Sequence, residues 1–486
     1  MLVSTSLPNW LAPGSPAIDQ AIRRASSPGY ESWWQRCAAV GFCANPVQTS
    51  AYDPDQGRRV TVMIRCGNRR AAICPSCSDL YAADTWQLVH AGAQGGHHGM
   101  QETTANRPQV FATLTAPSFG AVHTNNSRPG QADTVCHRAS SGTSHCPHGK
   151  ALWCNAIHGS DDPEVGQPLC PDCYDYTGHV LFNWHAPELW RRFAIALRRA
   201  VAVHLGRIGI DRDTVRVSFV KVAEYQRRAV VHYHALIRLD PPDNDDSTTG
   251  ASDTKVSAIE LAALVRQAAN QVRLPVTVDA AAGTAPTASE SEARMLRFGT
   301  QIDAQPLTDT GDTGKPGLAR RVAAYLAKYT TKSVAEFGIA ARRISPAAIA
   351  ELDIPAHTRR ILSTLANLAT LPANTAMAGW LHTLGYRGHI TTKSRRYSIT
   401  LTALRAARHH WRIGRTGQSE PDDCQDKPHG QQDWPSSAYE LSDWLIDGAG
   451  HRTDGGRLLV HTAALRAREY RYLARLDAGH NNGASP

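Results

Sequence analysis

The chain has 486 residues, which is too long for one small domain, and 42% of them are hydrophobic, enough for a sizeable core. Its 52 Lys and Arg residues exceed its 43 Asp and Glu residues, and the net charge of +9 favours nucleic acid as a partner. The sequence has neither a signal peptide nor an apolar run of about 18 residues, so we expect a cytoplasmic protein with no membrane partner. The eleven cysteines are then expected to bind metal rather than form disulfides.

The spacing of apolar residues predicts a mixture of strands and helices along the chain. The expected elements, in order, are a strand at 111–115, a helix at 188–206, a hairpin of two strands at 214–226 and 230–239, a helix at 256–272, a strand at 295–305, a helix at 317–333, a mostly helical stretch at 336–412 and a helix at 462–476. Polar stretches predict loops or linkers at 241–254, 280–292 and 413–435.

These elements predict an α+β fold in which covering helices pack on a central antiparallel sheet that holds the 111–115 strand and the 214–239 hairpin. Four segments are expected along the chain. They are an N-terminal cysteine-rich zinc region at 1–105, a core at 106–335 with insertions at about 124–178 and 241–292, a basic helical DNA-binding region at 336–415, and a linker with a C-terminal helix at 416–486.

The expected hairpin carries a candidate metal site. Residues two apart on a strand share a face, so His232 and His234 point the same way. Folding the hairpin back brings Glu224 beside them as a third ligand. Two imidazoles and one carboxylate leave positions open for substrate oxygens, which suits Mg²⁺ or Mn²⁺ used as a Lewis acid. The alternative is a pair of half-buried strand histidines that bind no metal.

The helix at 317–333 carries a candidate nucleophile. Tyr325, Lys328 and Tyr329 are three and four residues apart, so they lie on one helix face. A tyrosine hydroxyl with a pKa of about 10 is a weak nucleophile, and it needs either activation or a polarised target. A neighbouring lysine can stabilise the phenolate and orient a phosphate. The alternative is an amphipathic helix whose aromatic residues pack in the core.

The cysteines fall into two groups with the spacing of structural zinc ligands. The first group makes a four-cysteine site from Cys66, Cys74, Cys77 and either Cys43, which is favoured, or Cys37. The second group offers more than four ligands for one or two ions, and its pairing is open: Cys136, Cys146, His148, Cys154, His158, Cys170 and Cys173. Cys37 and Cys424 are expected to be free thiols.

A basic segment near the end of the helical stretch is a candidate DNA-binding surface. Its residues are Lys393, Arg395, Arg396, Arg405, Arg408 and Arg412. Contacts from these side chains to DNA phosphates would release counterions and make binding depend on salt. The alternative is a solvated basic helix face.

Three motifs, in this order, resemble those of the HUH endonuclease superfamily, in which two histidines flank a bulky residue. The matching stretches are Phe111-Ala112-Thr113-Leu114-Thr115-Ala116-Pro117, then His232-Tyr233-His234 with Glu224, then Tyr325 with Lys328. Tyr233 departs from the usual aliphatic residue between the histidines, although it is equally bulky. Tyr329 resembles the second tyrosine of rolling-circle initiators. The resemblance implies that Tyr325, Lys328 and Tyr329 are catalytic and that the central sheet is of the HUH type.

Further stretches resemble the RepSA-type replication initiators of actinobacterial plasmids and integrative conjugative elements. They are Cys66-Gly67-Asn68-Arg69-Arg70, Cys74-Pro75-Ser76-Cys77, Cys170-Pro171-Asp172-Cys173-Tyr174-Asp175-Tyr176 and Thr392-Lys393-Ser394-Arg395-Arg396-Tyr397-Ser398. The resemblance implies a metal-dependent, site-specific endonuclease that nicks a plasmid double-strand origin through a phosphotyrosine intermediate and starts rolling-circle replication. Its substrate would be origin DNA, single-stranded or supercoiled, and its partners a host helicase and DNA polymerase.

Two other functions fit part of the pattern. A conjugative relaxase shares the nicking chemistry and differs in the origin that it recognises. A zinc-containing DNA-binding regulator that never cuts would explain the charge and the cysteines. It would not explain why the two histidines, Glu224 and the tyrosine helix occur together.

Overall fold

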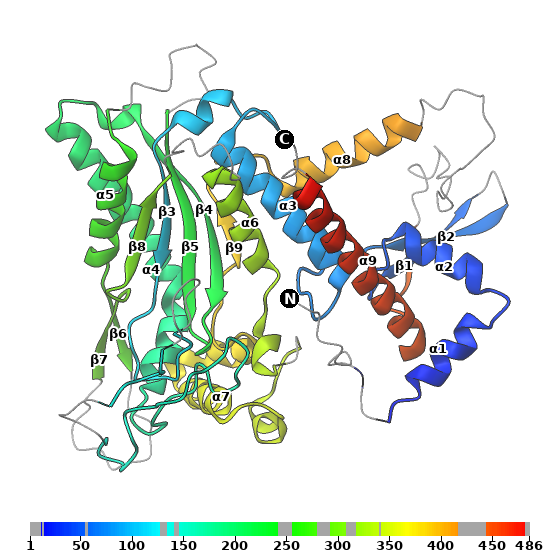
Figure 1. Ribbon diagram of the computed structural model, residues 1–486, viewed down its shortest axis with the longest axis horizontal. Helices are drawn as coiled ribbons and strands as arrows, with labels where there is room; N and C mark the ends of the chain where they lie inside the picture. Colours follow the sequence, from blue (N-terminus) through cyan, green and yellow to red (C-terminus); the bar gives the residue numbers. More distant parts are fainter. Residues whose placement is uncertain are drawn as a thin grey trace. The chain divides into compact units, whose positions relative to one another are not determined.

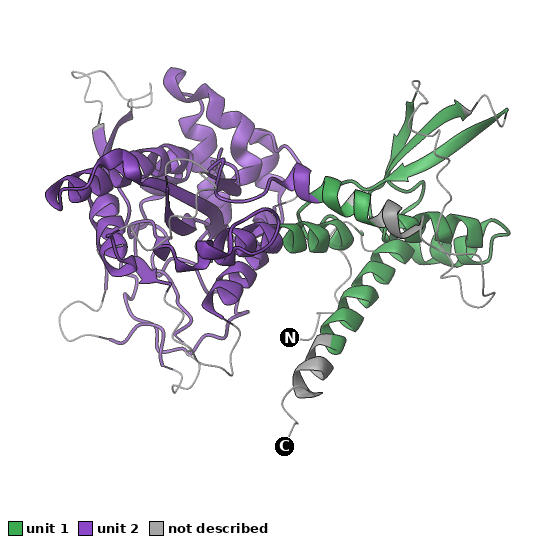
Figure 2. Ribbon diagram, turned by 90° about the horizontal axis from the view of Figure 1, so that it is seen from above, with its two compact units in different colours: residues 1–84, 405–486 green, residues 85–404 purple. Residues whose placement is uncertain are grey.

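The computed structural model describes residues 11, 14–53, 57–126, 134–139, 145–241, 255–278, 292–307, 317–339, 342–416 and 444–481. The chain forms two compact units, one of Met1–Asp84 with Arg405–Pro486 and one of Thr85–Leu404 (Figure 2). Both mix helices with antiparallel sheets, as the α+β expectation requires. Most of the loop and linker stretches expected at 241–254, 280–292 and 413–435, and Cys424 with them, lie outside the described residues.

The first unit combines both ends of the chain around a three-stranded antiparallel sheet. The sheet order is β10 (Leu445–Ala449), β1 (Val47–Asp53) and β2 (Arg58–Ile64). Its helices are α1 (Ala17–Ala25), α2 (Tyr30–Ala39) and α9 (Asp454–Asn481), together with parts of α3 (Pro75–Gln94) and α8 (Leu401–Thr416). Helix α9 extends beyond the expected 462–476 at both ends and packs on α1. The unit thus combines most of the first expected segment with the last one and the end of the third.

The second unit is built on a five-stranded antiparallel sheet (Figure 1). Its order is β8 (Ile302–Pro306), β3 (Gln109–Leu114), β5 (Val231–Asp240), β4 (Arg216–Tyr225) and β9 (Thr391–Lys393). The strand expected at 111–115 therefore pairs with the second strand of the expected hairpin, and the hairpin itself forms with Glu224 opposite His232.

Helices cover both faces of this sheet, and successive side chains of each strand point to opposite faces. Helices α4 (Tyr176–Arg207) and α5 (Ala258–Gln271) share one apolar core with Tyr233 and the residues on its face. Helix α6 (Leu318–Thr330) and the later residues of α3 pack with Leu236 on the opposite face. His232 and His234 alternate with Tyr233, so they lie on the α6 face.

Two expected elements have different bounds in the structure. The single strand expected at 295–305 is two strands, because β7 (Glu292–Leu296) pairs with β6 (Leu274–Val278) in a separate sheet and only β8 joins the central one. Between them Gly299 donates its N–H to the Thr115 carbonyl at 2.8 Å, and a Cβ there would lie 2.6 Å from the Ala116 oxygen. Helix α4 begins well before the expected residue 188 because its earlier turns are buried.

The remaining elements are short apart from one helix, α7 (Ala356–Leu368). The 3₁₀ segments are Glu102–Asn106, Arg212–Thr214, Val334–Phe337, Pro346–Glu351 and Pro372–Thr383. The stretch expected to be mostly helical at 336–412 therefore contains α7, three of these segments or parts of them, strand β9 and the start of α8. Among the described residues, no helix is both long enough and apolar enough to cross a membrane.

Candidate active site and metal-ligand clusters

Three candidate ligands meet on the α6 face of the central sheet. Glu224 on β4 is the direct cross-strand partner of His232 on β5, and His234 follows on the same face. One carboxylate oxygen of Glu224, Oε2, lies 3.1 Å from Nε2 of His232 and 3.2 Å from Nε2 of His234. One donor atom from each residue lies within 4.8 Å of the other two. The hairpin thus gathers the three residues that the sequence pattern proposed.

The surroundings of Glu224 and His234 favour the protonation states in which these two groups can bind a metal. Burial alone would raise the pKa of the Glu224 carboxyl, but hydrogen bonds with His232 and His234 outweigh burial and lower the pKa to about 2. Burial lowers the pKa of His234, which favours the neutral imidazole. The hydroxyl of Thr113 on β3 lies 3.1 Å from Nδ1 of His234, so it holds the far side of that ring.

Two tyrosines of α6 face the ligand cluster. The Tyr325 hydroxyl lies 3.3 Å from Nε2 of His234, and the residue is 38% exposed. The Tyr329 ring stacks near the His234 ring with centroids 5.7 Å apart, and it lies 4.6 Å from the Tyr325 ring. Burial and the neighbouring Tyr329 raise the pKa of the Tyr325 hydroxyl, so it is neutral at ordinary pH. The two hydroxyls and the ligand atoms therefore surround one small region.

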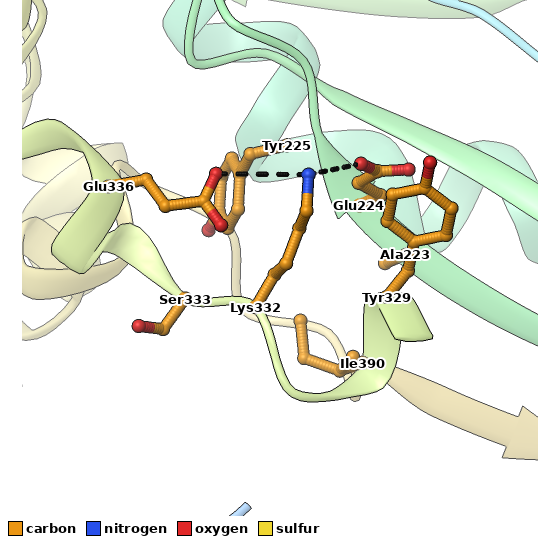
Figure 3. Close-up of a pocket in the computed structure, with 8 residues that line it drawn as sticks. All are labelled: Ala223, Glu224, Tyr225, Tyr329, Lys332, Ser333, Glu336 and Ile390. Carbon is orange, nitrogen blue, oxygen red and sulfur yellow. Dashed lines mark hydrogen bonds and ion pairs between the residues drawn. The ribbon is translucent and has the colours of Figure 1, made fainter. Parts of the chain in front are cut away.

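Lys332 reaches this region from just beyond α6 (Figure 3). Its Nζ donates to Oε1 of Glu224 at 3.0 Å and lies 4.8 Å from the centroid of the Tyr329 ring. The expected Lys328 is exposed, and its Nζ lies 5.7 Å from the same centroid. Lys332 lies beyond the C-terminal residue of α6, where helical spacing from Tyr325 no longer applies, so the sequence pattern did not point to it.

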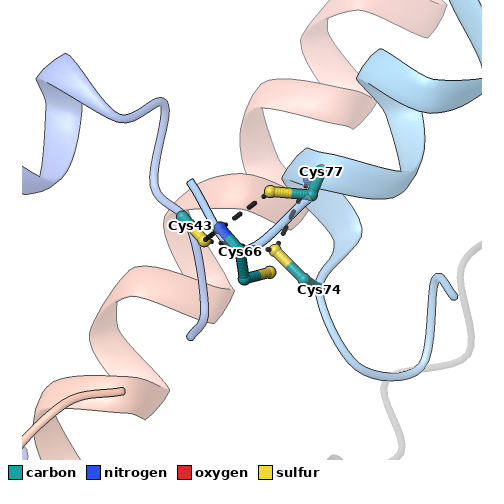
Figure 4. Close-up of side chains that lie close together, drawn as sticks. All are labelled: Cys43, Cys66, Cys74 and Cys77. Carbon is teal, nitrogen blue, oxygen red and sulfur yellow. Dashed lines mark hydrogen bonds between the residues drawn. The ribbon is translucent and has the colours of Figure 1, made fainter. Parts of the chain in front are cut away.

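The first cysteine group forms one compact cluster in the first unit (Figure 4). The Cys43 sulfur lies 3.8 Å from that of Cys74 and 3.6 Å from that of Cys77, and Cys66 completes the set. Backbone N–H groups of Ala44 and Cys66 point at two of these sulfurs at 3.3 Å. Cys37 packs in a different core and is not in the cluster. The four thiols are a candidate site for a metal such as zinc.

The second cysteine group divides into two clusters in the second unit. One contains Cys146, His148, Cys170 and Cys173, and the other contains His123, Cys136, Cys154 and His158. His123 was absent from the sequence-based set because it stands alone, far from any C-x-x-C pair. Both clusters have the composition of a four-coordinate metal site.

The expected DNA-binding residues are distributed over both units. Arg395 and Arg396 are exposed beside β9, whereas the Lys393 ammonium donates to the Ser398 carbonyl at 2.8 Å. In the first unit, Arg405 and Arg408 both pair with the buried carboxylate of Asp84. The side chain of Arg412 lies outside the described part of α8.

The fold and the site together define a mixed α/β protein whose sheet holds a two-histidine, one-carboxylate cluster beside a pair of tyrosines. Comparison with known proteins gives the family. Residues 29–465 match the family model described as "Replication initiator protein, pSAM2". The chain is 38% identical over 481 residues to a protein of Streptomyces ambofaciens named "Replication initiator protein", covering 94% of this chain and 95% of that relative. No solved structure matches it. The chain belongs to the RepSA family of replication initiator proteins.

Proposed function

We propose that this protein is an HUH-type endonuclease that nicks one strand at the double-strand origin of its element and so starts rolling-circle replication. The observation that carries the proposal is the position of the Tyr325 hydroxyl, 3.3 Å from the His234 nitrogen that also faces Glu224. A candidate nucleophile therefore lies next to a candidate metal centre. Membership of a replication initiator family supports DNA as the substrate.

The three ligand residues fit a divalent cation. Two Nε2 atoms and one carboxylate oxygen converge from one face of the hairpin, and Lys332 and Thr113 hold Glu224 and His234 from behind. Mixed nitrogen and oxygen donors with open positions suit Mg²⁺ or Mn²⁺. When bound, such an ion supplies Lewis-acid polarisation of the scissile phosphate.

The cleavage step follows from the placement of Tyr325. Its phenolic oxygen attacks the phosphorus, the bond from phosphorus to the 3′ oxygen breaks, and a phosphotyrosine forms on the 5′ side. The proton lost by the phenol is matched by the proton gained by the leaving 3′ oxygen, so a 3′ hydroxyl remains for the host polymerase. Burial and the neighbouring Tyr329 raise the pKa of the Tyr325 hydroxyl, so the attack requires removal of its proton.

Other parts of the chain are assigned supporting roles. Tyr329 lies on the same helix face as Tyr325 and would be the nucleophile in the second strand transfer, which closes the circle. The four-cysteine cluster would hold a structural zinc ion in the first unit. A host helicase would supply the unwinding. The exposed arginines beside β9 would contact DNA phosphates.

An origin-cleavage assay tests this function. Origin oligonucleotides, labelled on either side of the nick, are incubated with the wild-type chain and Mn²⁺ and run on a denaturing gel. We expect a covalent adduct on the 5′-phosphate side that Tyr325→Phe abolishes and that Tyr470→Phe, at an exposed tyrosine of the first unit, leaves unchanged. Cleavage that persists in Tyr325→Phe without an adduct would disprove the phosphotyrosine step.

A second set of variants tests the metal centre. His232→Ala and His234→Ala are expected to remove cleavage while the chain remains folded, and a chelator is expected to stop cleavage by the wild type. If a variant that carries both His232→Ala and His234→Ala cuts as fast as the wild type, the metal assignment is wrong. Sequence-specific origin binding with no cleavage under any metal condition would favour the non-cutting regulator instead. Cleavage at a transfer origin rather than a replication origin would identify a relaxase.

A further inference from the structure

The cysteine-rich insertion between β3 and α4 contains two clusters whose ligands alternate along the chain. One cluster uses His123 and Cys136 and then Cys154 and His158. The other uses the intervening pair, Cys146 and His148, and then the last pair, Cys170 and Cys173. Each cluster therefore closes a loop that contains a ligand pair of the other.

The distances within the His123 cluster match the edges of a tetrahedral zinc site. With zinc bonds of about 2.05 Å to nitrogen and 2.3 Å to sulfur, a tetrahedron has edges of about 3.3 Å between nitrogens and about 3.5 Å between nitrogen and sulfur. His123 Nδ1 lies 3.1 Å from His158 Nε2, and Cys154 Sγ lies 3.4 Å from that same nitrogen. Cys136 Sγ lies 3.9 Å from His123 Nδ1. Four donors at these separations have the spacing that one zinc ion requires.

Groups behind the ligands support the same conclusion. The Asp162 carboxylate lies 2.8 Å from Nδ1 of His158, which leaves the other ring nitrogen to face the cluster. The Thr124 N–H donates to the Cys136 sulfur at 3.2 Å, as backbone amides do when a cysteine sulfur carries charge. In the second cluster, His148 Nδ1 lies 3.2 Å from Cys173 Sγ and 3.8 Å from Cys170 Sγ.

The His123 cluster is connected to the turn of the active-site hairpin. His123 exchanges backbone hydrogen bonds with the 166–167 segment, both at 2.8 Å. At Gly166, whose φ is +92°, a Cβ would lie 2.4 Å from the Arg227 carbonyl. The Arg227 side chain donates to the Ser160 carbonyl and lies 3.5 Å from Asp161. Arg227 belongs to the turn that joins Glu224 on β4 to His232 on β5.

We propose that this insertion binds two zinc ions in alternating order and that the ion held by His123, Cys136, Cys154 and His158 holds the β4–β5 turn in place. The second ion is held by Cys146, His148, Cys170 and Cys173. Because each loop contains ligands of the other site, loss of the first ion weakens the second. This proposal does not depend on the nicking function, because it concerns metal content and the order of one turn.

Metal content and amide exchange of the full chain test the proposal. We expect about three zinc ions in the wild type, counting the four-cysteine cluster, and one or two in Cys136→Ser or His123→Ala. His137→Ala is the matched control, since His137 adjoins Cys136 but hydrogen-bonds the Val122 carbonyl and belongs to none of the ligand clusters found among the described residues. Hydrogen exchange at 226–230 should rise in the first two variants only. Full zinc in both ligand variants would overturn the site, and unchanged exchange after zinc loss would overturn its effect on the turn.

X-ray absorption at the zinc edge tests the pairing in the unaltered protein, so it does not require any variant to fold. The four-cysteine site and the two sites of the insertion together average three sulfurs and one nitrogen for each ion. A chain with only the four-cysteine site and the Cys146 site would show a clearly higher share of sulfur. That higher share, with two ions for each chain, would contradict the His123 site.

Discussion

Lys332 donates to Oε1 of Glu224 at 3.0 Å, while the other oxygen of that carboxylate faces both histidines. The lysine therefore occupies one oxygen and leaves the second directed toward the candidate metal position. The Lys332 Nζ also lies 3.9 Å from the Glu336 carboxylate, and burial raises the pKa of that glutamate. We infer that Lys332 positions the Glu224 carboxylate for the candidate metal site.

We predict that Lys332→Met weakens Mn²⁺ binding by about 10- to 100-fold, the usual effect of losing a group that orients a metal ligand. Lys332→Arg should restore much of the affinity, since it keeps a charged donor. Lys328→Met, one turn earlier and exposed, is the matched control and should bind as the wild type does. Isothermal titration with Mn²⁺ measures this directly. Equal affinities for the Lys332 and Lys328 variants would show that Lys332 does not orient Glu224.

The site could be predicted from sequence wherever two residues belong to one regular element. His232 and His234 share a strand face, and the short hairpin brings Glu224 opposite His232. The two-residue period of a strand and the length of the turn were therefore sufficient to predict that these three residues meet. Tyr325 and Tyr329 share a helix face for the same reason. The C-x-x-C pair is likewise local, because Cys74 immediately precedes α3 and Cys77 lies in the first turn of that helix.

Residues brought together by tertiary folding could not be predicted in this way. Lys332 meets Glu224 across 108 positions of the sequence, and no local period relates the two. His123 joins its cluster through the pairing of two irregular segments around Gly166. The prediction of a single strand at 295–305 was wrong. Gly299 packs on the backbone of Ala116 and Pro117, and this contact separates β7 from β8.

For the second tyrosine, we predict that Tyr329→Phe still nicks origin DNA but fails to release closed circles. Its ring lies 4.6 Å from that of Tyr325, so its hydroxyl can reach the same region after Tyr325 has become joined to DNA. Two-dimensional gels of replication intermediates distinguish nicking from closure. Normal closure by the variant would reduce Tyr329 to a packing residue, and loss of nicking in Tyr329→Phe but not in Tyr325→Phe would exchange the two roles.

The exposed pair beside β9 gives a prediction about DNA affinity. Neutralising Arg395 and Arg396 to glutamine should reduce the slope of log affinity against log salt by about 0.9 for each lost duplex contact. Arg191→Gln, at an exposed arginine of α4 that pairs with Glu188 at 2.7 Å, is the control. Fluorescence anisotropy over a range of salt gives the slopes. If the double variant keeps the slope of the wild type, these arginines are only a solvated surface.

Lys221 gives a prediction about stability and pH. It lies under α4 on the face of β4 opposite Glu224, with its Nζ 3.1 Å from the His389 carbonyl and 4.6 Å from the centroid of the Tyr233 ring. Burial lowers the pKa of Lys221 to about 7, against an unfolded value of about 10.4. Between these pH values the unfolded chain holds the proton and the folded chain does not. The cost of burying the charged lysine therefore falls as pH rises, and the free energy of unfolding increases.

We therefore predict that Lys221→Met stabilises the protein most at about pH 6, where the folded lysine is charged and buried, and that the advantage shrinks as pH rises toward 10. The expected change is on the order of 1 kcal/mol for each pH unit above the folded pKa. Urea unfolding of the wild type and the variant at several pH values, followed by tryptophan fluorescence, measures the difference. Lys328→Met, which also replaces a lysine by methionine but at an exposed position of α6, is the control. A constant difference between Lys221→Met and the wild type across this range would mean that Lys221 stays charged in the folded protein.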